Sequence, residues 1–245
     1  MRSEFRLIID IGNSYIKLAV LNDADIVHSH SAVSFDFPII EEQIKKYGIK
    51  SGIYASVRSN QPSFIQQTAE IIHLISMRYD LPIPLTSKYE TPETLGMDRL
   101  AAVIGAHSLF PDTHCLVIDM GTCIKYDFVD KEGCYWGGNI APGLQMRLES
   151  MHSMTSKLPF VEKAFNADNL GKSTEEALQN GAVWGIKLEV ERFIKILTEE
   201  WGEITIILSG GDSKYFGEII ESKIFVLPEL VLKGLVETLK FNLLE

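Results

Sequence analysis

Residues 7–14 read Leu-Ile-Ile-Asp-Ile-Gly-Asn-Ser, and residues 116–123 read Leu-Val-Ile-Asp-Met-Gly-Thr-Cys. In each stretch an apolar run ends in an aspartate, a glycine and small polar residues, and a second strand-like run follows, over residues 16–20 and 124–129. This pattern predicts a β-hairpin with a polar tip. Two such hairpins, one near the start and one near the midpoint, predict two similar α/β halves in one chain.

The hairpin tips carry groups that suit metal–phosphate chemistry. The carboxylates of Asp10 and Asp119 suit hydrated Mg²⁺, and Gly12 and Gly121 let backbone N–H groups approach a phosphate. One Asp-x-Gly tip by itself is an ordinary turn. Its recurrence at the equivalent point of a second half favours a functional interpretation, in which two facing tips grip one nucleotide.

The composition favours a small-molecule partner. The chain has 245 residues, of which 46% are hydrophobic, enough for a sizeable core in one large domain or two half-size ones. A formal net charge of −10, without any Lys/Arg cluster, argues against nucleic acid or an anionic membrane as the main partner. Three cysteines without C-x-x-C spacing signal neither a disulfide framework nor a zinc site. The first five residues lack a secretory signal, so we expect a cytoplasmic protein.

Strands and helices succeed one another in both halves, as in mixed α/β layers. In the first half the predicted elements are strands at 5–10, 15–22, 26–33 and 52–56 and helices at 38–47, 61–77 and 98–109. In the second half they are strands at 115–119, 122–130, 134–140 and 204–208 and helices at 145–155, 174–200 and 231–243. We therefore expect two domains, residues 1–112 and 113–245.

A four-residue motif opens the helix predicted at 98–109. It reads Gly96-Met97-Asp98-Arg99. Asp98 is either the residue that caps this helix or a functional carboxylate. A carboxylate beside bound ATP is what a hydroxyl-directed kinase needs as its base. Arg99 beside it would pair with a carboxylate on a substrate.

Glycines mark three further segments. Gly210 and Gly211 follow the apolar strand predicted at 204–208, and this loop is either an ordinary connection or, after two phosphate-type hairpins, an adenosine site. The segment 137–143, Gly-Gly-Asn-Ile-Ala-Pro-Gly, indicates close approach of its backbone to a ligand or to the other half. The spacing Gly181-x-x-x-Gly185 is typical of close helix–helix packing.

In this order and spacing, the motifs resemble the type III pantothenate kinase family, a branch of the actin-like, sugar-kinase and heat-shock ATPase superfamily. The likeness extends over nearly the whole chain. Residues 10–17 look like the family's first phosphate motif, 96–99 like its G-x-D-R motif and 119–122 like its second phosphate motif. The other matching segments are 137–143, which continues into 155–159, and 171–174, which precedes the long helix.

The resemblance implies a fold and an activity. The fold would be two ribonuclease H-like domains with mixed sheets flanked by helices and a nucleotide cleft between them. The activity would be ATP-dependent phosphorylation of the 4′-hydroxyl of pantothenate, the first step toward coenzyme A. The family also implies a homodimer with the substrate pocket near the interface.

The resemblance further implies a role for each matching residue. Asp98 would be the general base, and pantothenate would contact Tyr89, Gly96, Met97, Asp98, Arg99 and Thr174. The nucleotide would contact Asp10, Ile11, Gly12, Asn13, Ser14, Tyr15, Ile16, Lys17 and Thr122, together with the glycine pair Gly210 and Gly211. Asp10 would bind Mg²⁺ through water, and Asp119 would bind the monovalent cation, K⁺ or NH₄⁺, that the family uses.

Two residues depart from the family's second phosphate motif, which usually runs D-x-G-T-A-x-T. Cys123 is a mild change in size, whereas Lys125 brings an ammonium near the cation position unless strand alternation turns it away. If it lies there, the protein should depend less on K⁺ than a Lys125→Thr variant does. Two other functions stay open: an ATP-binding regulator without turnover, and a kinase for another small hydroxyl substrate.

Overall fold

The computed structural model describes residues 4–22, 25–165 and 169–243. The start of the chain, predicted to lead directly into the first strand, lies partly outside these ranges. The chain forms two compact units, each described here by itself. Unit 1 comprises Met1–Pro111, Gly133–Tyr135 and Glu229–Glu245, and unit 2 comprises Asp112–Glu132 and Trp136–Pro228.

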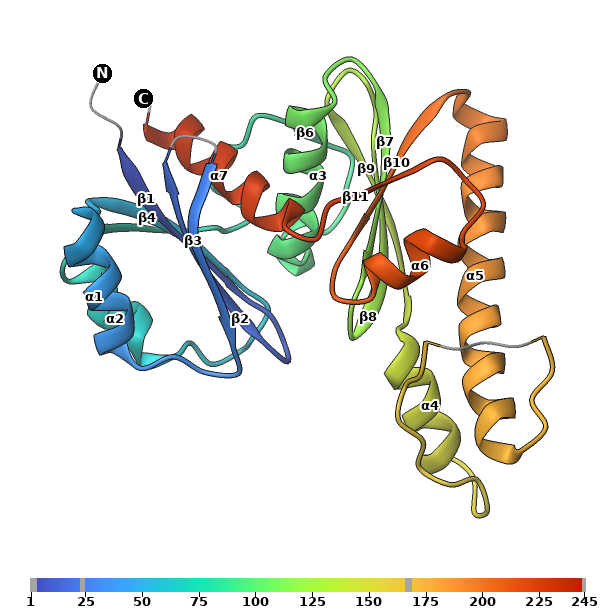
Figure 1. The fold of residues 1–245 in the computed structure, drawn as a ribbon. Helices are drawn as coiled ribbons and strands as arrows, with labels where there is room; N and C mark the ends of the chain where they lie inside the picture. Colours follow the sequence, from blue (N-terminus) through green and yellow to red (C-terminus); the bar gives the residue numbers. More distant parts are fainter. Residues whose placement is uncertain (1–3, 23–24, 166–168, 244–245) are drawn as a thin grey trace. The chain divides into compact units, whose positions relative to one another are not determined.

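Unit 1 is built on a five-stranded mixed sheet with the order β3-β2-β1-β4-β5 (Figure 1). β1 and β2 form the predicted hairpin, and β3 continues it antiparallel, whereas β4 and β5 run parallel to β1. The strands are β1 (Phe5–Ile11), β2 (Ile16–Asn22), β3 (Asp25–Ala32), β4 (Ser51–Ser56) and β5 (His73–Ser76). Because β1, β4 and β5 are parallel, their carboxyl ends meet at one edge of the sheet.

Helices cover both faces of this sheet (Figure 1). Leu7, Ile9 and Ile11 of β1 pack into an apolar cluster with α1 (Phe37–Tyr47) and α2 (Ser63–Ala69). On the other face lie α3 (Met97–Leu109) and α7 (Leu230–Leu243). These two helices approach very closely, since a Cβ atom at Gly234 would lie 1.7 Å from the Ala101 carbonyl oxygen.

Smaller elements connect unit 1. The 3-10 helix η1 (Pro92–Thr94) leads into α3, and Leu95 donates a backbone hydrogen bond to Pro92. The short strand β6 (Thr86–Ser87) pairs in parallel with Cys134 and Tyr135. These two residues are the start of β9 (Cys134–Pro142), whose remainder belongs to unit 2.

Unit 2 repeats the hairpin-based plan. Its strands follow the order β11-β10-β7-β8-β9, with β7 and β8 forming the second predicted hairpin and β10 and β11 running parallel to β7. One face packs against helices around a single apolar cluster (Figure 1). The new elements are β7 (His114–Met120), β8 (Cys123–Val129), β10 (Ile204–Ser209), β11 (Ile224–Val226), α4 (Leu144–Ser153), α5 (Thr174–Trp201) and α6 (Ser213–Ile219).

The α/β class with two mixed sheets flanked by helices is confirmed, and so are both hairpins. The helix predicted at 61–77 is wrong in its second half: α2 ends at Ala69, and His73–Ser76 is strand β5, paired with β4. The C-terminal helix was expected in the second domain, residues 113–245. In the structure, α7 groups with unit 1. Among the described residues, every helix is too short or too polar to cross a membrane.

Candidate functional site

The first hairpin tip lies at the carboxyl edge of the unit 1 sheet. Gly12 N donates to Tyr15 O at 3.0 Å, which closes the turn between β1 and β2. The side chains of Asn13, Ser14 and Tyr15 are exposed. Ile11 and Ile16 are buried at the strand ends, and Asp10 faces Lys17 directly in the strand register. The predicted nucleotide-binding residues 10–17 therefore form one turn with its polar groups accessible.

Arg58 holds this turn, and no local sequence pattern predicted this role. Its Nε donates to Gly12 O at 2.8 Å and its Nη2 to Asn13 O at 3.2 Å. Arg58 follows β4, and its partners are more than forty residues away in sequence. The signal was indirect: if β1 and β4 are parallel neighbours, the residues that follow them meet at one edge. A guanidinium presents several donors in a fixed fork, which suits two adjacent carbonyl oxygens.

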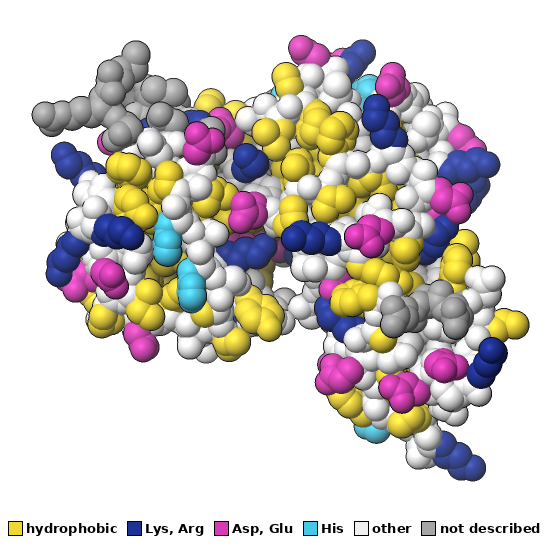
Figure 2. Space-filling model, viewed as in Figure 1, with side chains coloured by type: hydrophobic (Ala, Val, Ile, Leu, Met, Phe, Trp, Pro, Cys, Tyr) yellow, Lys and Arg dark blue, Asp and Glu magenta, His cyan; other side chains and the backbone are white. Residues whose placement is uncertain are grey.

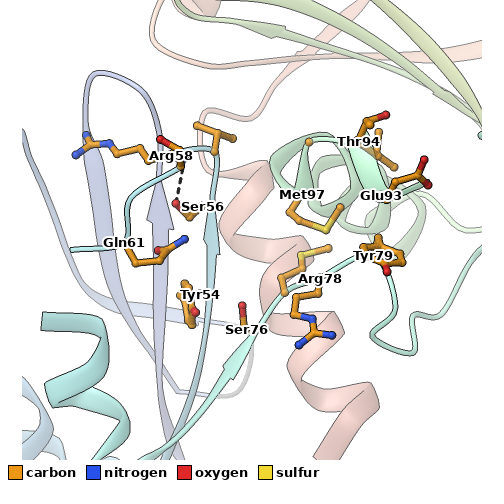
Figure 3. Close-up of a pocket in the computed structure, with 15 residues that line it drawn as sticks. Tyr54, Ser56, Arg58, Gln61, Ser76, Arg78, Tyr79, Glu93, Thr94 and Met97 are labelled. Atoms are coloured by element: carbon orange, nitrogen blue, oxygen red, sulfur yellow. Dashed lines mark hydrogen bonds between the residues drawn. The ribbon is translucent and has the colours of Figure 1, made fainter. Parts of the chain in front are cut away.

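A pocket of about 560 Å³ opens at the same edge of unit 1 (Figure 3). Its walls come from the ends of β4 and β5, including Ser56 and Ser76, and from the start of α3, including Gly96 and Met97. Arg58 lies at its rim, and its side chain runs from there toward the hairpin. Pockets of 300 to 1,000 Å³ outside the carboxyl ends of parallel strands commonly hold small ligands.

The carboxylate of Asp98 folds back over the N-terminus of α3. Gly96 is the N-cap, so Asp98 is a first-turn residue and not the cap. Its Oδ1 accepts a hydrogen bond from Arg99 N at 2.9 Å. A Cβ atom at Gly96 would lie only 2.6 Å from this oxygen, so the glycine is what leaves room for the carboxylate. Asp98 is half-buried, next to the pocket wall formed by Gly96 and Met97.

Arg99 and Tyr89 come together as the resemblance implies. The Arg99 guanidinium lies 5.6 Å from the centre of the Tyr89 ring, and its Nη1 is 3.4 Å from the Tyr89 hydroxyl. Tyr89 in turn stacks on Tyr135, with ring centroids 5.9 Å apart. Arg99 is 95% buried, at a relative exposure of 5%. The stack fixes the aromatic ring, and the ring fixes the cation.

In unit 2 the second hairpin tip is braced by the glycine-rich segment. Gly121 N donates to Cys123 O, and Gly143 N donates to Thr122 O, both at 3.1 Å. A Cβ atom at Gly143 would lie 2.2 Å from the Gly121 carbonyl oxygen. A Cβ at Gly138 would be 1.6 Å from Tyr126 O. The close backbone approach predicted for 137–143 is therefore made to β8 and the hairpin tip of the same unit.

A partly buried polar network anchors this segment, and no sequence pattern indicated it. The Tyr126 hydroxyl donates to Glu189 at 2.6 Å, and Arg147 pairs with the other Glu189 oxygen at 2.6 Å. Arg147 Nε also donates to Pro142 O at 2.9 Å, just before Gly143. Burial, reinforced by the Glu189 carboxylate, raises the pKa of the Tyr126 phenol, which stays a hydrogen-bond donor.

The glycine pair after β10 packs against the same hairpin. Gly210 has φ +86°, and a Cβ atom there would lie 2.5 Å from both Asp119 Oδ1 and Met120 O. Asp212 N donates to Met120 O at 3.0 Å, and Ser213 Oγ donates to Gly210 O at 2.7 Å. Gly211 is exposed, and a Cβ there would meet nothing within 4 Å. Predicted residues Asp119, Thr122 and Gly210 thus belong to one cluster.

Lys125 lies beside Asp119. Its Nζ is 2.7 Å from Asp119 Oδ2, and the two residues are direct partners in the register of β7 and β8. Their side chains are 21% and 16% exposed. Since Ile124 and Tyr126 point into the helix-covered core, Lys125 and Asp119 lie on the opposite face of the sheet. Strand alternation therefore brings the lysine to the aspartate.

Thr174 begins α5, as predicted. Ser173 is the N-cap, and its hydroxyl accepts from Glu176 N at 3.2 Å. The Glu176 side chain accepts a hydrogen bond from Lys172 N at 2.7 Å, one residue before the N-cap, so the two side chains form a capping box shifted by one residue. Thr174 is exposed and belongs to unit 2, whereas Tyr89 and residues 96–99 belong to unit 1.

The hairpins offer single carboxylates, which suit a metal ion whose other ligands are phosphate and water. In the part of the chain that the structure describes, His, Cys, Asp and Glu side chains form no cluster of three that could cage a metal ion. Mg²⁺ commonly takes only one or two protein carboxylates beside substrate phosphates and water. Asp10, half-buried at the end of β1, offers such a carboxylate.

Charges elsewhere are mixed. On the face shown in Figure 2, Lys and Arg side chains are scattered among Asp and Glu. Among the described residues, most surface ion pairs join residues close in sequence, such as Lys45 with Glu41 on α1. Exposed pairs of this kind contribute little to stability. The buried Asp119–Lys125 pair differs from them in its place beside the hairpin tip.

Comparison with known proteins identifies relatives over the full chain. A family model described as type III pantothenate kinase matches residues 6–196. A type III pantothenate kinase of Phocaeicola vulgatus is 39% identical over 237 residues, which are 96% of this chain and 98% of that protein. The protein of the same description from Porphyromonas gingivalis is 38% identical over 243 residues, 97% and 99% of the two chains.

Solved structures share the fold at low sequence identity. A protein from Campylobacter jejuni, described as a Baf family transcriptional activator, has a TM-score of 0.63 at 19% identity and covers 98% of this chain and 100% of its own. The ROK hexokinase of Thermus thermophilus has a TM-score of 0.53 at 11% identity, with 96% and 98% covered. At these sequence identities, the structural similarity shows the actin-like sugar-kinase fold and nothing about function.

Proposed function

The chain belongs to the type III pantothenate kinase family, and from that premise we propose how its two units divide one reaction. The activity is ATP-dependent phosphorylation of pantothenate on its 4′-hydroxyl, the first step of coenzyme A biosynthesis. We assign the acceptor to Tyr89, Thr174 and residues 96–99, with Asp98 as the general base, and the nucleotide to residues 10–17, Thr122 and the glycine pair 210–211.

One observation carries the assignment of the base. The Asp98 carboxylate is held over the start of α3 by the Arg99 amide, and the absence of a side chain at Gly96 makes room for it. It sits beside a pocket whose size suits a small acceptor. A general base must lie within hydrogen-bond reach of the proton that it takes. We propose that the acceptor hydroxyl binds at the Gly96–Met97 wall, within hydrogen-bond reach of the neighbouring Asp98 carboxylate.

Arg99 and Tyr89 would bind the other end of the acceptor. Pantothenate carries a carboxylate, and a buried guanidinium is the side chain best suited to a carboxylate. The Tyr89 ring under the guanidinium and the stack on Tyr135 hold that cation in place. Thr174 would contribute a hydroxyl from the start of α5. In this arrangement Arg99 orients the substrate, and its neighbour Asp98 receives the proton.

We propose that the nucleotide is bound by residues 10–17, Thr122, Gly210 and Gly211. The turn at Gly12–Tyr15 and the tip at Gly121–Thr122 would face the phosphates, and exposed Gly211 would lie against the nucleoside. Family membership implies ATP with a divalent metal. Asp10 would hold that metal through water, and the metal would neutralise the β- and γ-phosphates.

A product assay tests the proposal directly. Purified protein is incubated with ATP, Mg²⁺ and a panel of small hydroxyl compounds, and ADP release is coupled to detection of the phosphorylated product by mass. Phosphopantothenate should form, and turnover with other hydroxyl compounds should be far lower. A preference for another acceptor would favour the second candidate, a different small-molecule kinase. ATP binding without any phosphorylated product would favour the third, a regulator, as the description of the Campylobacter jejuni structure suggests for that protein.

A homodimer is part of the proposal, and α5 offers a face for it. Ala177, Gly181 and Leu188 are exposed and share one side of this helix with the half-buried Trp184. The close packing predicted for Gly181 is absent among the described residues, since a Cβ there would meet nothing within 4 Å. This face, with two small residues beside an exposed leucine and a half-buried tryptophan, suits packing against a second copy of the same helix. Light scattering should give the mass of two chains, and Leu188→Glu should reduce it to one.

Two finer points complete the proposal. A cytoplasmic location is proposed because the reaction consumes ATP. The monovalent cation that the resemblance implies at Asp119 stays a prediction, and the residues present do not fit it well: the carboxylate oxygen that would receive the cation already pairs with the Lys125 ammonium.

A further inference from the structure

We propose that the Lys125 ammonium is a built-in cation of the second phosphate hairpin, so that this enzyme needs no added monovalent cation. The inference rests on the proposed function, because membership of a kinase family is what makes Asp119 a phosphate-side residue. It goes beyond that function by making Lys125 a positioning residue for the reaction.

The first support is the contact itself. Lys125 Nζ and Asp119 Oδ2 are 2.7 Å apart, and both side chains are mostly buried. A carboxylate that already touches an ammonium has its charge largely neutralised. A K⁺ ion at the same oxygen would meet repulsion from the ammonium, and that repulsion is strong where water is partly excluded.

The second support is the lack of room on the other side of the carboxylate. The backbone at Gly210 comes so close that a Cβ there would be 2.5 Å from Asp119 Oδ1. Oδ1 is thus flanked by the β10 turn, and Oδ2 by Lys125 on β8. The aspartate is held between two neighbouring strands, since Ser209 and Lys125 are its register partners on either side.

The third support is the equivalent arrangement in the first hairpin. There Lys17 is the direct register partner of Asp10, as Lys125 is of Asp119. Directly opposed residues on neighbouring antiparallel strands place their side chains within contact distance. The chain therefore sets an aspartate and a lysine side by side at the phosphate end of each hairpin. At Asp119, where the ammonium is in direct contact, it supplies positive charge in place of a monovalent ion, whereas at Asp10 the lysine would act beside the Mg²⁺ that is proposed to bind through water.

Turnover in different salts tests the proposal. Pantothenate phosphorylation is measured in KCl, NH₄Cl and tetramethylammonium chloride at equal ionic strength, for wild type and Lys125→Thr. Wild-type kcat should change less than about twofold among the salts, whereas the variant should lose about tenfold or more in tetramethylammonium chloride and recover in KCl or NH₄Cl. Exposed Lys223, in the same unit, gives the control variant Lys223→Thr, which should behave like wild type. Wild-type turnover that requires K⁺ would overturn the proposal.

A second readout does not depend on activity. The melting temperature is followed as KCl replaces tetramethylammonium chloride. A K⁺-specific rise is expected for Lys125→Thr, where the cation position is vacated, and not for wild type. A wild-type rise as large as the variant's would contradict the proposal. If Lys125→Thr does not fold, the wild-type salt series alone decides. If wild type makes no phosphopantothenate, the proposed function fails, whereas the melting series separately shows whether Lys125 keeps K⁺ from Asp119: a K⁺-specific rise in Lys125→Thr alone supports that contact role, and equal behaviour of the two proteins contradicts it.

Discussion

At the scale of single residues, the side chains proposed to take part in the reaction are positioned by particular neighbours. One neighbour acts by lacking a side chain, and the others act through a side chain that makes a contact. Gly96 leaves space for the Asp98 carboxylate, Tyr89 supports Arg99, and Lys125 neutralises Asp119. Each of these neighbours acts through a contact of a few ångströms. Substitutions at such positions should therefore change catalysis more than they change stability.

Arg58 provides a clear test at this scale. Arg58→Ala removes the two hydrogen bonds that fix the carbonyl oxygens of Gly12 and Asn13. We expect kcat/KM for ATP to fall about tenfold or more, since hydrogen bonds from a charged group are worth roughly 1.5–3 kcal/mol each. Arg58→Lys should recover only part of the loss, because an ammonium lacks the planar fork.

The control for Arg58 is Lys50→Ala, at the opposite end of β4, where an exposed cation is lost far from the turn. Its kcat/KM for ATP should match wild type. Equal losses in the Arg58 and Lys50 variants would mean that only net charge matters. Steady-state kinetics with ATP as the varied substrate make the comparison.

At the scale of elements, the hairpins rest on glycines that allow backbones to touch. The turn of β7 and β8 is packed against Gly143, and its Asp119 against Gly210. The Tyr126–Glu189–Arg147 network holds the segment before Gly143 in register with α4 and α5. The position of the phosphate-side tip is thus set by three elements together.

Two glycine substitutions distinguish the effect of close backbone packing on stability from the effect of helix propensity. Gly143→Ala forces a methyl to within 2.2 Å of the Gly121 oxygen, so the tip must shift. We expect about 1–3 kcal/mol of destabilisation and a lower kcat/KM for ATP. Gly181→Ala lies in open space on α5 within one chain and, made in the Leu188→Glu background that removes the proposed dimer contact, should instead stabilise the protein by about 0.4–1 kcal/mol. Chemical denaturation of both variants checks the signs, and a Gly143→Ala protein as stable and active as wild type would refute the packing role.

The sequence predicted those parts of the elements whose signal is local. Both hairpins, the start of α3 and the cap of α5 follow from patterns within a few residues. His73–Ser76 was misread as helix because a short apolar run does not reveal that it pairs with β4. The role of Arg58 could not be predicted, because it depends on contacts with Gly12 and Asn13, which are distant in sequence. The grouping of α7 with unit 1 likewise depends on its packing against α3.

At the scale of the whole molecule, each of the two units carries one Asp-x-Gly hairpin. Asp10 in unit 1 and Asp119 in unit 2 are each placed beside a phosphate-side turn. We expect Asp10→Ala and Asp119→Ala each to abolish turnover while circular dichroism and melting behaviour stay near wild type. Neither unit should compensate for the other. Undiminished activity in the Asp10 variant would contradict a shared nucleotide site.

Asp98 is proposed to take the proton from the hydroxyl of pantothenate. The most direct test is kcat of Asp98→Asn, measured alongside its melting temperature and its ATP affinity. Asparagine keeps the shape of the side chain and loses the ability to accept the proton, so kcat should fall by about 10²–10⁴-fold with the other two quantities nearly unchanged. A near-normal kcat in the folded variant would contradict the claim, because it would make the carboxylate structural.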